Sequence, residues 1–150
     1  MNAEELAKSF DMESHVEHGS FKEIHFKYEG DGRAPSGALY YYVPGGEKTL
    51  FHRIDCGEYW CYAAGESLEL WMISPKGELS VRTLGIEKGA EPVIYVPEGF
   101  VFASKQKSPA CGDGTFLTCI TVPRFSAEGF ELFEKDRVTA LCPEAGVFWE

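Results

Sequence analysis

The residues of this sequence with the clearest chemical potential are His52 and Glu58, an imidazole and a carboxylate in the segment between Gly46 and Gly65. A carboxylate beside an imidazole fixes its tautomer and raises its basicity, which suits proton transfer near neutral pH. The same two groups are also ligands for Zn, Mn or Fe. The segment therefore predicts either a site for proton transfer or part of a metal site.

Strands are expected to position these two side chains, because short apolar or alternating runs cover most of the chain and turn residues separate them. The runs are 21–28, 38–43, 50–54, 59–64, 67–74, 79–84, 92–97, 100–104 and 115–122. Many short strands at such intervals indicate an all-β barrel or jelly-roll sandwich and argue against a βαβ fold. Short peripheral helices are expected at residues 2–10 and at residues 126–134, the second with Ser126 as its N-cap and one helical turn or more in length.

Alternation along the strands assigns side chains to faces. His52 points to one face of its strand and Arg53 to the other, where an ion pair is the expected role of the arginine. On the next strand Glu58, Trp60 and Tyr62 share one face. If this is the interior face, His52 and Glu58 can form a hydrogen bond and act as a catalytic pair. The alternative is a satisfied polar pair that lines the interior and does no chemistry.

The length indicates one domain, residues 1–150, and the apolar content is sufficient for a hydrophobic core. Aromatic residues make up 14% of the chain, which indicates a cavity lined by aromatic side chains or a large interface. A net charge of −10 argues against nucleic-acid and anionic membrane partners. The five cysteines include no C-x-x-C pair, the N-terminus does not resemble a signal peptide, and no apolar run reaches membrane-spanning length. A cytoplasmic protein with free thiols is expected. Strands that are apolar on both faces need further cover, which predicts a homodimer.

Several blocks of the sequence resemble one family. They are the opening His15–Glu23, the block FHRIDCGEYWCYAAG at 51–65, Val96–Gly99, Cys119–Phe125 and Gly129–Leu132. In this order and spacing they are similar to a group of small uncharacterised single-domain proteins of the cupin superfamily, cupin family five, over residues 12–134. The resemblance implies a cupin-type jelly-roll β-barrel that is usually dimeric. Glu17 and Glu23 belong to the family opening and are candidates to reach the site.

The resemblance also bears on metal binding, since cupin metals take two histidines and a glutamate from a first motif and a histidine from a second. Here Ile54 and Phe102 stand at two of these four positions, and only His52 and Glu58 remain. Three further histidines could fill the gap: His15, His18 and His25. The expected cofactor is none, with weak or adventitious divalent metal at His52 and Glu58 as the alternative.

Aromatic side chains are expected to line a cavity for a small molecule. The predicted ligand-binding residues are Tyr40, Tyr42, Trp60, Tyr62, Phe102 and Glu23. Such a lining suits a planar or apolar ligand, or the apolar face of a sugar. The alternative for each of these aromatic residues is ordinary core packing.

Three functions follow from these observations. The first is a metal-independent isomerase, epimerase or lyase on a carbohydrate-like or carbonyl substrate, with His52 as the base and Glu58 orienting it or donating a proton. The second is a non-catalytic cupin that binds or senses a ligand. The third is a metal-dependent cupin enzyme. Sequence alone names neither the substrate nor the pathway.

Overall fold

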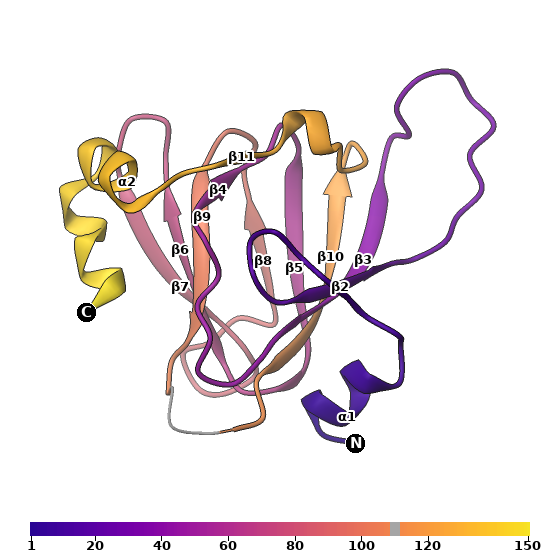
Figure 1. Ribbon diagram of the computed structural model, residues 1–150, viewed down its shortest axis with the longest axis horizontal. Coiled ribbons are helices and arrows are strands. Elements are labelled where there is room, and N and C mark those ends of the chain that lie inside the picture. Colours follow the sequence, from indigo (N-terminus) through magenta and orange to yellow (C-terminus); the bar gives the residue numbers. More distant parts are fainter. Residues whose placement is uncertain (109–111) are drawn as a thin grey trace.

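Two antiparallel β-sheets face each other in the computed structural model, which describes residues 1–108 and 112–150 (Figure 1). The six-stranded sheet has the order β1-β2-β3-β10-β5-β8, and the five-stranded sheet has the order β11-β4-β9-β6-β7. Short helices lie at the periphery. The predicted all-β class is therefore confirmed.

The strands follow the sequence pattern closely. The six-stranded sheet contains β1 (Glu13–Ser14), β2 (Ser20–Glu23), β3 (Gly37–Val43), β5 (Gly57–Gly65), β8 (Val93–Val96) and β10 (Thr115–Val122). The five-stranded sheet contains β4 (His52–Arg53), β6 (Leu68–Ile73), β7 (Leu79–Leu84), β9 (Val101–Gln106) and β11 (Glu131–Leu132). The helices are α1 (Ala3–Lys8), η1 (Ala127–Gly129), α2 (Lys135–Leu141) and η2 (Pro143–Trp149).

Alternating side chains place the main core between the two sheets. Trp60 of β5, Leu70 of β6, Phe102 of β9 and Leu117 of β10 are buried together there. Outside this core, α1 covers part of the six-stranded sheet, while α2 and η2 cover the five-stranded sheet. Phe148 of η2 is buried in this second layer, which gives the apolar C-terminal residues their packing partner.

The barrel predicted from the sequence is not closed. In the described residues the strands form two separate hydrogen-bonded sheets, and the bridge between Leu84 at the end of β7 and Glu91 just before β8 is isolated. The sheets are held against each other by buried side chains rather than by a continuous ladder.

The peripheral segments differ in how far they match the prediction. Residues 2–10 contain α1, whose capping box joins Asn2 and Glu5, as expected for a short N-terminal helix. Residues 126–134 contain the single turn η1, the least that was expected there, and the Ser126 side chain makes no capping bond. Every helix in the described residues falls far short of the roughly 20 residues that a bilayer crossing requires.

A long connection, residues 24–36, projects from the sheets between β2 and β3 (Figure 1). The strand predicted over 21–28 therefore ends at Glu23. Arg33 ties the connection to the body: its guanidinium bonds both carboxylate oxygens of Asp55, at 3.1 and 2.7 Å, and its Nε donates to the carbonyl of Arg124 at 2.6 Å. This anchor fixes the backbone of Arg124 close to the end of β10.

Candidate functional site

A cavity of about 80 Å³ lies between the two sheets. Its buried lining includes Glu17, His52, Glu58 and Trp60. Glu23 and Arg124 also line it, and with side chains 51% and 43% exposed they mark its opening to solvent. Polar groups thus lie at both the closed end and the open end of the cavity.

His52, the first residue of β4, is held rigidly. Its ring lies between Phe102, with centroids 4.2 Å apart, and Phe130, with centroids 5.3 Å apart. Its Nδ1 lies 2.9 Å from the carbonyl oxygen of Leu50. Since a carbonyl oxygen only accepts hydrogen bonds, Nδ1 must carry a proton.

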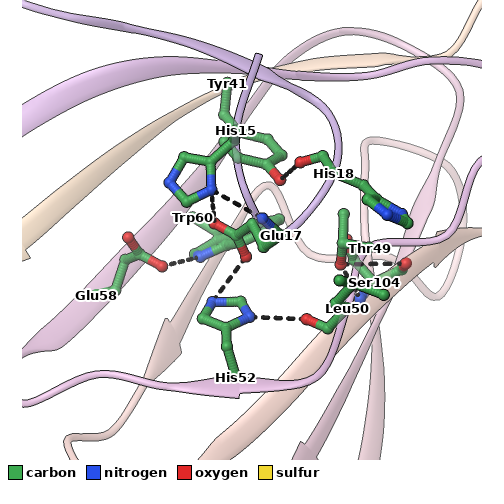
Figure 2. A network of polar contacts seen from close by, with 10 residues as sticks. All are labelled: His15, Glu17, His18, Tyr41, Thr49, Leu50, His52, Glu58, Trp60 and Ser104. Atoms are coloured by element: carbon green, nitrogen blue, oxygen red, sulfur yellow. Dashed lines mark hydrogen bonds and ion pairs between the residues drawn. The ribbon is translucent and has the colours of Figure 1, made fainter. Parts of the chain in front are cut away.

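The other ring nitrogen of His52 meets the carboxylate of Glu17, with 2.8 Å between Nε2 and Oε2 (Figure 2). Nδ1 already carries one proton. The proton shared between Nε2 and Oε2 therefore either belongs to the ring, which is then positively charged, or belongs to the carboxyl group, which is then neutral. Burial lowers the pKa of His52, but the charge and the hydrogen bond of Glu17 outweigh it, so the pKa is raised. The short contact and the raised pKa of the ring both favour an imidazolium paired with a carboxylate.

The turn between β1 and β2 brings Glu17 to this position. The N–H of Leu50 donates to the carbonyl of Glu17 at 2.8 Å, and the Tyr41 hydroxyl donates to the carbonyl of His18 at 2.5 Å. His18 and Gly19 both have positive φ, 76° and 73°, which turns the chain sharply enough for its polar groups to point inward. The backbone of this turn is thus fixed independently of the carboxylate.

His15, on the same turn, has a fixed tautomer. The N–H of Glu17 donates to Nδ1 of His15 at 3.1 Å, so that nitrogen is unprotonated and the proton lies on Nε2. Burial lowers the pKa of His15, although the nearby charge of Glu17 acts in the opposite direction. The surroundings thus lower the pKa of one imidazole at the cavity and raise the pKa of the other.

Glu58 is the second carboxyl group of the cavity. Its Oε1 accepts a hydrogen bond of 2.5 Å from the indole N–H of Trp60, two residues along β5. Burial and the charge of Glu17 raise the pKa of Glu58 to about 7, although the Trp60 bond and His52 lower it. Glu58 therefore exchanges a proton at neutral pH.

The predicted hydrogen bond between His52 and Glu58 is wrong. Within the described residues His52 pairs with Glu17, and Glu58 pairs with Trp60. The two predicted residues do line one cavity, but the hairpin residue Glu17 takes the place at the imidazole.

The predicted aromatic lining holds only in part. Trp60 lines the cavity, together with Tyr41. Tyr40 and Tyr42, in contrast, belong to the cluster beneath α1 on the opposite face of β3. The prediction that they line the cavity is wrong, and the tyrosine between them, Tyr41, lines it instead. Burial raises the pKa of Tyr42 to about 12, and its hydroxyl donates to the carbonyl of Asp113 at 2.7 Å.

The remaining predicted aromatics lie outside the lining. Tyr62 packs against the core near the other end of β5, where its hydroxyl donates to the carbonyl of Gly65 at 2.6 Å. Phe102 lies behind His52 as a supporting wall. Glu23, the predicted polar contributor, is at the opening and pairs with Arg124.

Other residues considered from the sequence have structural roles. Arg53 points away from the cavity and pairs with Glu131 at 3.1 Å, as predicted. The thiol of Cys56 is buried, and burial raises its pKa to about 12, which opposes a reactive thiolate. Cys111 lies outside the described residues. His18 and His25 are exposed and do not line the cavity.

Glu17 was a candidate only through the family resemblance and had no assigned role, and Arg124 was not predicted as a site residue. The H-x-E pattern of His15 and Glu17 was a usable signal, since alternate residues on one strand or turn can face the same way. Arg124 follows the predicted last strand directly, and no periodicity marks it as a cavity residue.

Comparison with protein families identifies the fold. A family model described as "Cupin superfamily (DUF985)" matches residues 4–133. The chain belongs to this family. The family resemblance seen in the sequence is thereby confirmed, and comparison with curated proteins found no match.

Solved structures agree with this assignment. A protein from Shewanella oneidensis is 32% identical, with a TM-score of 0.86, and the alignment covers 98% of this chain and 94% of that one. A hypothetical protein from Leishmania major is 23% identical, with a TM-score of 0.84 and coverage of 97% and 95%. Oxalate decarboxylase from Bacillus subtilis shares the cupin fold at 13% identity, with a TM-score of 0.60 over 87% of this chain but only 34% of that enzyme.

The donor set of this cupin does not fit the usual metal. Ile54 and Phe102, which stand at two of the four ligand positions, are buried in the core and offer no donor atom. Both ring nitrogens of His52 are engaged, and Glu58 accepts the Trp60 indole proton. Across residues 1–108 and 112–150, no three His, Cys, Asp or Glu side chains gather as metal ligands would.

Proposed function

We propose that this cupin binds a small hydroxylated or carbonyl compound in its cavity and moves a proton on it without a metal, as an isomerase or epimerase. One observation supports this most strongly: two buried carboxyl groups, Glu17 and Glu58, line the same cavity with different partners, the imidazole of His52 for the first and the indole N–H of Trp60 for the second. Two carboxyl groups with different surroundings in one site are the usual arrangement of a base and an acid.

The proton transfer is balanced by these two residues. Glu17 takes the proton from the carbon next to the substrate carbonyl, while protonated Glu58 donates to the carbonyl oxygen, which gives an enol or enediol. Return of a proton to a carbon, and of the hydroxyl proton to Glu58, completes the interconversion. The cavity volume of about 80 Å³, roughly half of the 150 Å³ that holds benzene in an engineered cavity, limits the buried part to a few heavy atoms.

His52 has a positioning role in this mechanism, which differs from the predicted role as base. Both of its nitrogens are engaged, Nδ1 with Leu50 and Nε2 with Glu17. Its ring holds the Glu17 carboxyl group in place through the 2.8 Å contact between Nε2 and Oε2. Trp60 fixes the position of Glu58 by donating its indole N–H to Oε1.

Hydrogen exchange tests the proposed activity. Dihydroxyacetone, glyceraldehyde and pyruvate are incubated with the protein in D₂O, and loss of the C–H signal next to the carbonyl is followed by proton NMR. Exchange above background is expected for at least one compound, and Glu17→Gln is expected to slow it by about 100-fold or more. Glu58→Gln is expected to remove the decline in rate above pH 7, since ionised Glu58 cannot donate.

Glu69→Gln is the matched control, because Glu69 accepts a hydrogen bond from the indole of Trp71 at 3.2 Å but lies outside the cavity. Exchange that survives in Glu17→Gln contradicts the mechanism. Compounds that raise the melting temperature without exchanging support a non-catalytic ligand-binding cupin instead.

We also propose that the chain forms a homodimer through the outer face of the six-stranded sheet. Large apolar side chains are exposed on its adjacent strands β5, β8 and β10: Tyr59, Val93, Tyr95, Ile120 and Val122. A contiguous apolar surface of this kind favours a self-complementary contact.

Light scattering after size exclusion tests the dimer. The native protein is expected to have twice the mass of one chain, and the double variant Tyr59→Lys with Tyr95→Lys is expected to have the mass of one chain. Ile86→Lys, at an exposed position after β7, is the control, and a monomeric native protein contradicts the proposal.

A further inference from the structure

Among the described residues that line the cavity, Arg124 is the one with a permanent positive charge, and it stands at the opening. The closed end holds two carboxyl groups, Glu17 and Glu58. A ligand in this cavity therefore meets acid–base groups at one end and a guanidinium at the other. A negatively charged group of a ligand is therefore favoured at the opening, beside Arg124, and disfavoured at the closed end, beside the two carboxyl groups.

The position of Arg124 is built by the surrounding chain. Its N–H donates to the carbonyl of Ala34 at 3.1 Å, and its own carbonyl accepts from Nε of Arg33 at 2.6 Å. The guanidinium carbon lies 5.0 Å from the centroid of the Phe26 ring, within the range of a cation–π contact. All three partners belong to the projecting connection 24–36.

Gly37 completes this support at the first residue of β3. A Cβ atom there would lie only 2.8 Å from Cγ of Arg124, so the glycine leaves the space in which the arginine stem lies. The stem is therefore packed across the start of the strand, with the charged end free to pair at the opening.

Glu23 is the acidic partner of Arg124, through a short contact to one Nη atom. A guanidinium has five N–H donors, so one carboxylate oxygen leaves most of them available to another planar anion. Exposed ion pairs of this type contribute little to stability, so a ligand carboxylate can compete with Glu23 at small cost.

We infer that the ligand of this cavity is a short 2-oxo or 2-hydroxy carboxylate, whose carboxylate binds Arg124 while its carbonyl or hydroxyl end reaches Glu17 and Glu58. This inference rests on the proposed use of the cavity as the binding site. Arginine suits the task because its planar fork matches a carboxylate. The buried part of the ligand stays neutral, which agrees with the two carboxyl groups at the closed end.

Calorimetric titration with matched acids and amides tests the inference. Pyruvate is compared with pyruvamide, and lactate with lactamide, since each pair differs mainly in the charge that Arg124 would bind. The native protein is expected to bind at least one acid about 10-fold or more tightly than its amide. Arg124→Gln is expected to abolish this preference while leaving amide affinity unchanged, and Arg124→Lys to retain part of it.

Two further variants test whether the acid preference depends on the free guanidinium of Arg124. Glu23→Gln is expected to tighten binding of the acid several-fold, because it frees the guanidinium. Arg82→Gln removes an exposed arginine that pairs with Glu91 away from the cavity, and should leave the preference intact. Melting temperatures verify that each variant is folded.

Equal affinity for acid and amide, a preference that persists in Arg124→Gln, or no binding of either acid overturns the inference. These outcomes are separable from failure of the proposed activity. Exchange on dihydroxyacetone without acid preference retains the activity and overturns the inference. An acid preference that depends on Arg124, without hydrogen exchange on any compound, supports the inference and contradicts the proposed activity.

Discussion

Replacing Glu17 with leucine is expected to lower the free energy of unfolding by about 3–5 kcal/mol, the range found when one member of a buried ion pair is removed. Both partners are enclosed, with 6% of Glu17 and 2% of His52 exposed. The variant leaves the imidazolium of His52 without its counter-charge in the interior, so the ring must lose its proton or remain unpaired. Urea unfolding at pH 7 measures the loss.

The double variant, Glu17→Leu with His52→Leu, distinguishes the pair from general packing. Removing both charged groups is expected to cost less than the sum of the single variants by about 2 kcal/mol or more, since no buried charge remains. Glu23→Leu removes an exposed carboxylate near the same hairpin and should change stability little. Additive single and double effects would show that the pair is not an ion pair.

Replacing Glu58 with glutamine is expected to make the protein more stable than the native form at high pH and nearly equal to it at pH 5. The pKa of Glu58 is raised from its ordinary 4.5 to about 7, so the folded protein keeps a proton that the unfolded chain releases between these values. Stability therefore falls as pH rises through this window, by about 3 kcal/mol in total. Glutamine keeps an acceptor for the Trp60 indole but does not ionise.

Other buried groups contribute to the same pH profile. His52, with a raised pKa, contributes stability at low pH that is lost as the pH rises through its folded pKa. His15, with a lowered pKa, acts in the opposite direction, since the neutral ring is favoured in the fold. The difference between Glu58→Gln and the native protein removes the contribution of His15 but includes the coupling with His52, whose pKa the charge of Glu58 helps to raise.

Urea unfolding at pH 5, 6, 7 and 8 measures this difference. Glu69→Gln is the control, because it has the same hydrogen bond from a tryptophan two residues along the strand but lies outside the cavity. A constant difference between the Glu58→Gln and native proteins across this range would show that the carboxyl does not titrate there.

The architecture was predictable because most strands are marked by turns and by apolar runs. Register within a run was harder to predict. In β3 the residues Leu39 to Val43 are all apolar or aromatic, so alternation gives no phase, and the choice between Tyr41 and its neighbours Tyr40 and Tyr42 is made by α1 packing on one face. Closure of the sheets likewise depends on side-chain packing between layers, which no local pattern records.

Alternation was enough to predict the strand residues of the candidate site, whereas the hairpin residue Glu17 was a candidate only through the family resemblance. His52, Glu58 and Trp60 share an interior because alternation fixes their faces. Glu17 reaches His52 through long-range contacts, the backbone bond from Leu50 and the positive φ of His18, which arise only once the chain has folded. Arg124 is placed in a similar way by the connection 24–36.

Nitrogen NMR of the His52 ring is the most direct measurement of the central claim, that His52 and Glu17 form an imidazolium–carboxylate pair. The native protein is labelled with ¹⁵N-histidine, and His52→Gln identifies the signals. At pH 7 both ring nitrogens are expected to carry protons, with neutralisation above the ordinary pKa of 6.5, because the pairing with Glu17 raises the pKa. A ring protonated only on Nδ1 at pH 7, with Nε2 bare, would contradict the pair and with it the ionised base at Glu17.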